Sequence, residues 1–189
     1  VGANNTLKPY PDAAWCTWNE TVRNEPQKHW ICPQSVYADR AGSLWVLDPA
    51  SPGLKATVPG GPKLVKIDPK TNTVVQNVAF PESVAPRKSY LNDVRVDTQN
   101  NFAYITDSGA GALIVVNLAT KRARRLLGNH PSTKSENLIL TVEGRVWRNS
   151  SGELPSIDSD GIALSPDRAY LYYHALTGRP LYRIATQYL

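Results

Sequence analysis

An internal repeat limits the folds that this chain can adopt. Three segments, residues 35–48, 93–107 and 161–174, each contain two short β-rich runs joined by a turn. Within the runs, β-branched and aromatic residues predominate, and Asn, Asp, Pro or Gly residues separate one run from the next. Each segment therefore predicts an antiparallel β-hairpin.

Further strands follow each hairpin. A third apolar run comes after every copy, at residues 64–67, 113–116 and 181–184, and a fourth follows the first two copies at 73–78 and 122–127. Recurring groups of four antiparallel strands are typical of β-propeller blades, which bury their faces by stacking on one another. We predict an all-β fold of propeller blades, each a four-stranded antiparallel sheet, with about three blades in this chain.

The repeats divide one domain, residues 1–189, into successive parts. These are an N-terminal segment (1–33), a blade (34–80), a second blade (91–128), an insertion (129–158) and a partial blade (159–189). Three blades do not close a ring, so we expect an incomplete propeller that is part of a longer protein. Two alternatives stay open: self-association completes the ring, or residues 1–33 supply outer strands for a further blade.

The composition is that of a globular protein and argues against several classes of partner. Hydrophobic residues make up 41% and charged residues 20% of the chain, and no apolar run reaches the roughly 18 residues of a membrane helix. The net charge of +5 comes from scattered basic residues, apart from a run at 121–125 that we interpret as a solvated strand face. Phosphate-binding glycine loops and nucleophile elbows are absent from the sequence. We predict no nucleic-acid partner and no membrane segment.

Two further features concern the compartment. Cys16 and Cys32 are either a disulfide of a secreted chain or two buried thiols, and the sequence leaves both open. Asn4, Asn19 and Asn149 each begin an Asn-x-Ser/Thr acceptor motif for glycosylation. These motifs favour an extracellular location.

Polar side chains recur at one place in the three copies, two residues before the first apolar position of the first strand. They are Gln34, Asn92 and Asp160. In a propeller this place faces the central channel, where converging oxygen atoms suit a small polar ligand or a hard cation such as calcium. Asp93, next to Asn92, is a further candidate.

A second recurring position lies at the end of the second strand and holds Asp48, Asp107 and His174. Asp107, or the neighbouring Asp93, could serve as a base towards a substrate or water molecule that a metal polarises. The structural alternative is that these residues cap turns or accept backbone hydrogen bonds without any ligand.

Several motifs resemble the yellow/major royal jelly protein family. They lie at residues 44–48, 91–94, 103–109, 112–115, 160–166 and 170–174. The resemblance extends over most of the chain and implies a secreted protein related to six-bladed propellers. It further implies either binding of small aromatic amines in the central channel or a link to pigment formation, as in dopachrome-converting members.

The same family is distantly similar to gluconolactonase-type propellers, which hold a divalent cation through Glu, Asn and Asp. On that comparison Asn92 and Asp160 match two of the cation ligands. Residues 32–34 read Cys-Pro-Gln where the comparison expects a glutamate. The first carboxylate of such a metal site is therefore missing from this chain.

Two functions of different class follow. The first is a secreted propeller that binds a small molecule in its channel without turnover, with Gln34, Asn92, Asp93 and His174 as ligand-binding residues. A purely structural or interaction role also stays open, because a fold does not determine a function.

The alternative is a divalent-cation-dependent hydrolase of lactones or esters. In it, Asn92 and Asp160 would hold the metal, with calcium as a candidate ion, and Asp107 or Asp160 would carry the proton. The residues leave open whether the protein is an enzyme.

Overall fold

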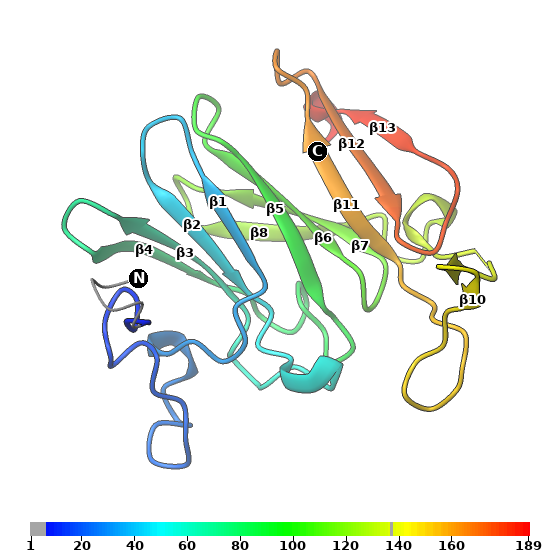
Figure 1. Cartoon of the computed structure of the whole chain (residues 1–189). Coiled ribbons are helices and arrows are strands. Elements are labelled where there is room, and N and C mark those ends of the chain that lie inside the picture. The colour runs from blue at the N-terminus through cyan, green and yellow to red at the C-terminus, as the bar shows by residue number, and fades with distance from the viewer. Residues whose placement is uncertain (1–6, 137) are drawn as a thin grey trace.

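The computed structural model describes residues 7–136 and 138–189, and within them four antiparallel sheets build an all-β fold (Figure 1). Two sheets have four strands, in the orders β1-β2-β3-β4 and β5-β6-β7-β8, and a third has the order β11-β12-β13. Each strand pairs with the next one along the chain, as in the blades of a propeller. The prediction of an all-β chain with about three antiparallel blades is confirmed.

The strands coincide closely with the apolar runs of the sequence. The first blade contains β1 (Ser35–Ala38), β2 (Leu44–Asp48), β3 (Lys63–Asp68) and β4 (Thr73–Ala79). The second contains β5 (Leu91–Asp97), β6 (Phe102–Asp107), β7 (Ala112–Asn117) and β8 (Arg122–Leu126). The third contains β11 (Ser159–Leu164), β12 (Tyr170–Ala175) and β13 (Tyr182–Ala185). A small hairpin, β9 (Thr141–Val142) and β10 (Arg145–Val146), lies between the second and third blades.

The helical content is limited to short 3-10 turns in the described residues. They are η1 (Pro26–Lys28), η2 (Pro52–Leu54), η3 (Pro131–Thr133) and η4 (Thr186–Tyr188). No helix in the described ranges is long and apolar enough to cross a membrane.

Two apolar layers hold the three blades together. The first layer lies between the first and second blades and includes Trp45, Leu47, Leu64, Val94, Ile105 and Ile114. The second layer joins the opposite face of the second blade to the third and includes Tyr104, Leu113, Val115, Ile162, Leu171 and Tyr173. Because strand side chains alternate between faces, the second blade buries both of its faces and becomes the centre of the stack.

The N-terminal segment covers the other face of the first blade. Tyr10, Trp15 and Trp30 pack against the apolar residues Val46, Val65 and Ile67. The two indole rings lie 4.5 Å apart, and the Trp30 indole N–H donates to the Tyr10 carbonyl at 2.8 Å. Residues 7–33 contain no strand, so in this structure they act as an aromatic cover rather than as outer strands.

The two cysteines and the described asparagines of the glycosylation motifs lie at the surface or near it. Cys16 is exposed and Cys32 is half-buried, and both are free thiols in this structure. Asn19 and Asn149 are exposed in loops, whereas Asn4 lies outside the described residues.

The first strands of the three blades are neighbours, with β5 between β1 and β11. The turns that follow these strands lie at the same end of the molecule, at the top of Figure 1. The opposite end of the first strands carries the recurring polar residues. Each end of this strand group therefore gathers residues from all three blades.

Candidate functional site

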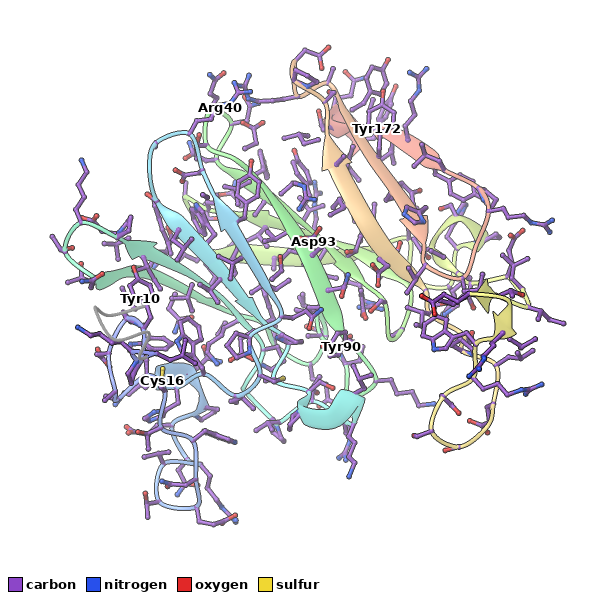
Figure 2. All side chains as sticks on the ribbon, viewed as in Figure 1. Tyr10, Cys16, Arg40, Tyr90, Asp93 and Tyr172 are labelled. Atoms are coloured by element: carbon purple, nitrogen blue, oxygen red, sulfur yellow. The ribbon has the colours of Figure 1, made fainter. Side chains whose placement is uncertain are left out.

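The recurring polar residues meet at the lower end of the first strands. The Gln34 amide nitrogen donates to the Asn92 side-chain oxygen at 3.1 Å, and the Tyr90 hydroxyl donates to the Gln34 side-chain oxygen. The Asn92 side chain also interacts with the Asp160 carboxyl. Four side chains from three blades thus form one polar cluster, and Figure 2 labels Tyr90 at this end.

Local irregularities in two strands aim these side chains. The pairing register of β5 with β6 shifts between Leu91 and Val94, and that of β11 with β12 shifts between Ser159 and Gly161. Each shift inserts one extra residue, which is the geometry of a β-bulge. A bulge bends its strand and redirects the side chain at that place. The bulges therefore lie at the strand positions occupied by two members of the polar cluster.

Asp160 is the member with the most unusual environment. Its carboxyl is half-buried, and burial raises its pKa above the ordinary value. The negative charge of Asp93 raises it further, while His174 and the Asn92 hydrogen bond lower it. Because burial is the largest of these effects, Asp160 favours its neutral form more than an exposed carboxyl does.

His174 packs directly over the bulge in β11. A Cβ atom added to Gly161 would lie 2.4 Å from the His174 Nε2 atom, so the ring occupies the space that only a glycine leaves open. The strand register gives Ala175, not His174, the position in the third blade that is equivalent to Asp48 and Asp107. The predicted equivalence of His174 with those two aspartates is therefore wrong by one residue, because Tyr173, not Tyr172, pairs with Ile162.

Asp93 is held by charged and polar partners. Its carboxylate accepts a hydrogen bond from the Ser35 hydroxyl at 2.7 Å and forms an ion pair with Arg95 at 2.9 Å. The residue therefore joins the first two blades and contributes negative charge next to Asp160.

Asp107 lies deeper and is fully buried. Its carboxylate pairs with Arg125 at 2.6 Å and accepts hydrogen bonds from the Ser89 hydroxyl and from the backbone N–H groups of Tyr90 and Gly109. These contacts give Asp107 a structural task at the end of β6. The proton-carrying role predicted for it stays a prediction.

A cavity of about 310 Å³ opens beside the polar cluster. Its lining consists of Ser51, Leu54, Lys55, Lys88, Ser89, Tyr90, Asn92, Ser108, Gly109, Ser156, Ile157 and Asp160. This volume lies at the lower end of the range of small-molecule sites, roughly 300–1,000 Å³. Of the predicted site residues, Asn92 and Asp160 line the cavity, while Gln34 touches it through Tyr90 and Asn92.

Sequence reasoning missed the other ten residues of this lining, among them Tyr90 and two lysines. Tyr90 directly precedes the motif at 91–94, and its position beside a recurring polar residue was the signal that could have found it. Lys55 and Lys88 come from loops outside the repeats. Only the folded arrangement brings those two loops to the cavity.

The residues present do not fit a calcium site as they are arranged. In the described ranges, no three His, Cys, Asp or Glu side chains lie together as a ligand set. The side-chain oxygen of Gln34 accepts from Tyr90, and that of Asn92 accepts from Gln34. Calcium takes six to eight oxygen ligands, whereas these two amide oxygens already face protein donors.

Comparisons with known proteins agree with the repeat and the motifs. A family model described as Major royal jelly protein matches residues 31–189. Major royal jelly proteins 7 and 2 of Apis mellifera are each 28% identical to the chain, over 189 and 188 residues. The alignments cover 96% and 95% of this chain but 40% and 38% of those proteins. The chain thus spans about two fifths of their length.

Among solved structures, a putative 6-phosphogluconolactonase from Bacteroides uniformis superposes with a TM-score of 0.46 at 13% identity. The match covers 81% of this chain and 36% of that one.

Proposed function

The chain belongs to the major royal jelly protein family, and from that premise we propose that it is part of a secreted propeller that binds a small organic molecule at one mouth of its central channel. The proposed site is the cavity lined by Tyr90, Asn92 and Asp160. The observation that carries the proposal is the half-buried Asp160 carboxylate, held beside a cavity of ligand size by residues from three blades.

The Asp160 carboxylate favours an amine with an aromatic or apolar body, although Lys55 and Lys88 also line the cavity. A protonated amine would supply the positive charge that a half-buried carboxylate lacks, and it would form a charge-assisted hydrogen bond with Asp160. Leu54, Tyr90 and Ile157 would contact the apolar part. The resemblance to amine-binding animal members of the family points to the same class of ligand.

The remaining cluster residues would position this site. Gln34 connects the Tyr90 hydroxyl to the Asn92 amide and so fixes both side chains. His174 and Asp93 adjust the charge next to Asp160. We expect their removal to weaken binding indirectly, through the orientation and charge of the carboxylate.

The alternative of a divalent-cation-dependent lactonase or esterase has less support. Asn92 and Asp160 are neighbours, as that reaction would require, but the amide oxygens of the cluster accept hydrogen bonds from the protein. Binding of a cation would need these side chains to turn away from their partners.

A closed ring also requires further protein surfaces that cover exposed apolar residues of the first and third blades. Val36 on β1 is 62% exposed and Leu181 beside β13 is 67% exposed, and neither residue belongs to the apolar layers between the blades. We propose that additional blades of a longer protein, or self-association of this chain, cover such outer faces.

The amine site is tested by calorimetry with phenethylamine and, as a neutral control of the same shape, phenethyl alcohol. We expect phenethylamine to bind the wild type and to bind Asp160→Asn at least about tenfold more weakly, as for the loss of one charged hydrogen bond. Asp167→Asn, at an exposed turn, is the matched control and should bind as the wild type does. Equal binding of phenethylamine to wild type and Asp160→Asn would contradict the proposal.

A further inference from the structure

A second cavity lies at the opposite end of the first strands. It has a volume of about 310 Å³ and is lined by Tyr37, Arg40, Arg95, Val96, Thr98, Ala163, Leu164, Ser165, Pro166 and Arg168. Figure 2 labels Arg40 at the upper end of the blades and Tyr90 at the lower end, with Asp93 between them. The lining residues come from all three blades, and none of them lines the cavity beside Asp160.

Three arginines, one from each blade, give this cavity its character. Arg95 forms an ion pair with Asp93 at 2.9 Å, and the Arg168 Nε atom lies 3.2 Å from the Asp97 carboxylate. Arg40 is exposed, and its side chain has no ion pair or hydrogen bond within the described part of the chain. Of the three guanidinium groups, only that of Arg40 is therefore without a carboxylate partner in the described part of the chain.

Two further carboxylates lie in these turns, and they add negative charge but do not occupy the Arg40 donors. Asp39 is buried and accepts hydrogen bonds from the Trp45 indole at 2.8 Å and from the backbone of its own turn. Asp167 accepts from the Ser165 hydroxyl and from the backbone N–H of Ala169. Both carboxylates are thus engaged locally, within the turns to which they belong.

The free donors match an oxyanion. A guanidinium group carries five N–H donors in a planar fork that fits carboxylate, sulfate and phosphate oxygens. The Arg168 ion pair is made through Nε, so its terminal nitrogens, like those of Arg40, are available to a ligand. Arg95 lies over the Tyr37 ring at 5.9 Å, which fixes a cation and an aromatic face side by side.

We propose that this cavity is a second binding site, specific for small molecules that carry an oxyanion group on an apolar or aromatic body. Arg40 and Arg168 bind the oxyanion through their free N–H donors, and Arg95, paired with Asp93, lies beside them. The body lies against Tyr37, Val96 and Leu164. The site shares no residue with the proposed amine site and does not depend on it.

Calorimetry with phenyl phosphate, inorganic phosphate and benzyl alcohol tests the site. Phenyl phosphate should bind more tightly than inorganic phosphate, and benzyl alcohol should not bind. Arg40→Ala and Arg168→Gln should each weaken phenyl phosphate binding about tenfold, as for the loss of a charged hydrogen bond. Added sodium chloride should weaken binding as well, because the arginines are only partly buried.

Arg122→Ala is the matched control, since Arg122 is an exposed arginine on the outer strand β8. It should bind phenyl phosphate as the wild type does. Equal losses in Arg122→Ala and Arg40→Ala would reveal non-specific attraction and overturn the proposal, as would the absence of binding at millimolar concentrations. Equal affinity for phenyl phosphate and inorganic phosphate would overturn the proposed contacts of the ligand's aromatic body with Tyr37, Val96 and Leu164. Arg40→Lys keeps the positive charge at an exposed position. This variant should bind phenyl phosphate with an affinity between those of the wild type and Arg40→Ala, and its melting temperature should be unchanged, which shows that the loss of binding is not a loss of folding.

Discussion

Asp48 and Asp107 occupy the same position in the first and second blades, and both are fully buried. Each accepts backbone N–H groups from the segment that leads into the first strand of its blade. Each also forms an ion pair with a cation from another strand of the blade, Lys63 at 2.9 Å and Arg125 at 2.6 Å. The repeated aspartate therefore fixes the entry of the chain into each blade.

Replacement of Lys63 tests this role in the first blade. Lys63 is completely buried and donates to Asp48 and to the Pro26 carbonyl. Lys63→Met would leave a buried carboxylate without its cation, which costs about 3–5 kcal/mol of the free energy of unfolding. Urea unfolding followed by tryptophan fluorescence measures this loss.

The surface pair of Arg23 with Glu20 supplies the comparison, because both side chains are largely exposed. Glu20→Ala should change the stability little, since exposed ion pairs contribute little. The double variant Asp48→Asn, Lys63→Met should lose less than the sum of the two single losses. A Lys63→Met chain as stable as the wild type would show that Asp48 needs no cation.

The contact of His174 with Gly161 gives a second prediction. The three atoms nearest to an added Cβ at Gly161 all belong to the His174 ring, the closest at 2.4 Å. Gly161→Ala should therefore displace the ring and cost about 1–3 kcal/mol, as overpacking does. In a His174→Ala background the same substitution should cost much less. Thermal or urea unfolding of the four variants measures this coupling, and equal costs in both backgrounds would contradict it.

Much of the fold was predictable because each blade has a recognisable local sequence pattern. Alternating apolar residues and turn residues define β5 and β6, and the same pattern in three copies indicates stacking. The aromatic cover of the first blade was not predictable. Tyr10, Trp15 and Trp30 have no periodic spacing, and only tertiary packing gives them a common face.

The candidate site was predictable in part for the same reason. Asn92 and Asp160 are equivalent in the repeat, and the structure places both beside one cavity. The bulges that aim them depend on the partner strand, so the sequence of one strand does not reveal them. Arg40, Arg95 and Arg168 occupy non-equivalent positions in the three copies, and an alignment of the repeats therefore could not group them.

Removal of divalent cations gives a third prediction. Because the amide oxygens of Gln34 and Asn92 accept hydrogen bonds within the protein, we expect the melting temperature to be the same in calcium, magnesium, zinc or a chelator. A ligand that binds only the folded state raises stability by roughly 2.7 kcal/mol at a hundredfold excess over its Kd. A rise with calcium that is lost in Asp160→Ala would contradict this prediction and favour the hydrolase.

The half-buried carboxyl of Asp160 makes the free energy of unfolding depend on pH. Burial raises the pKa of Asp160 in the folded chain, so between the ordinary pKa and this raised value the folded chain binds more protons than the unfolded one. Its contribution to stability is therefore complete below the ordinary pKa and is lost as the pH rises through the raised pKa. Asp160→Asn should be more stable than the wild type at neutral pH, and this advantage should disappear at acid pH.

Urea unfolding of both proteins from acid to neutral pH measures the effect, with Asp167→Asn as a control of opposite sign. Hydrogen bonds from Ser165 and Ala169 lower the pKa of the exposed Asp167 carboxyl. Asp167 therefore contributes stability above its ordinary pKa and loses it as the pH falls, so Asp167→Asn should be less stable than the wild type at neutral pH. If the stability of Asp160→Asn instead equals that of the wild type at every pH, Asp160 ionises like an exposed carboxyl. Burial then does not raise its pKa in the folded chain.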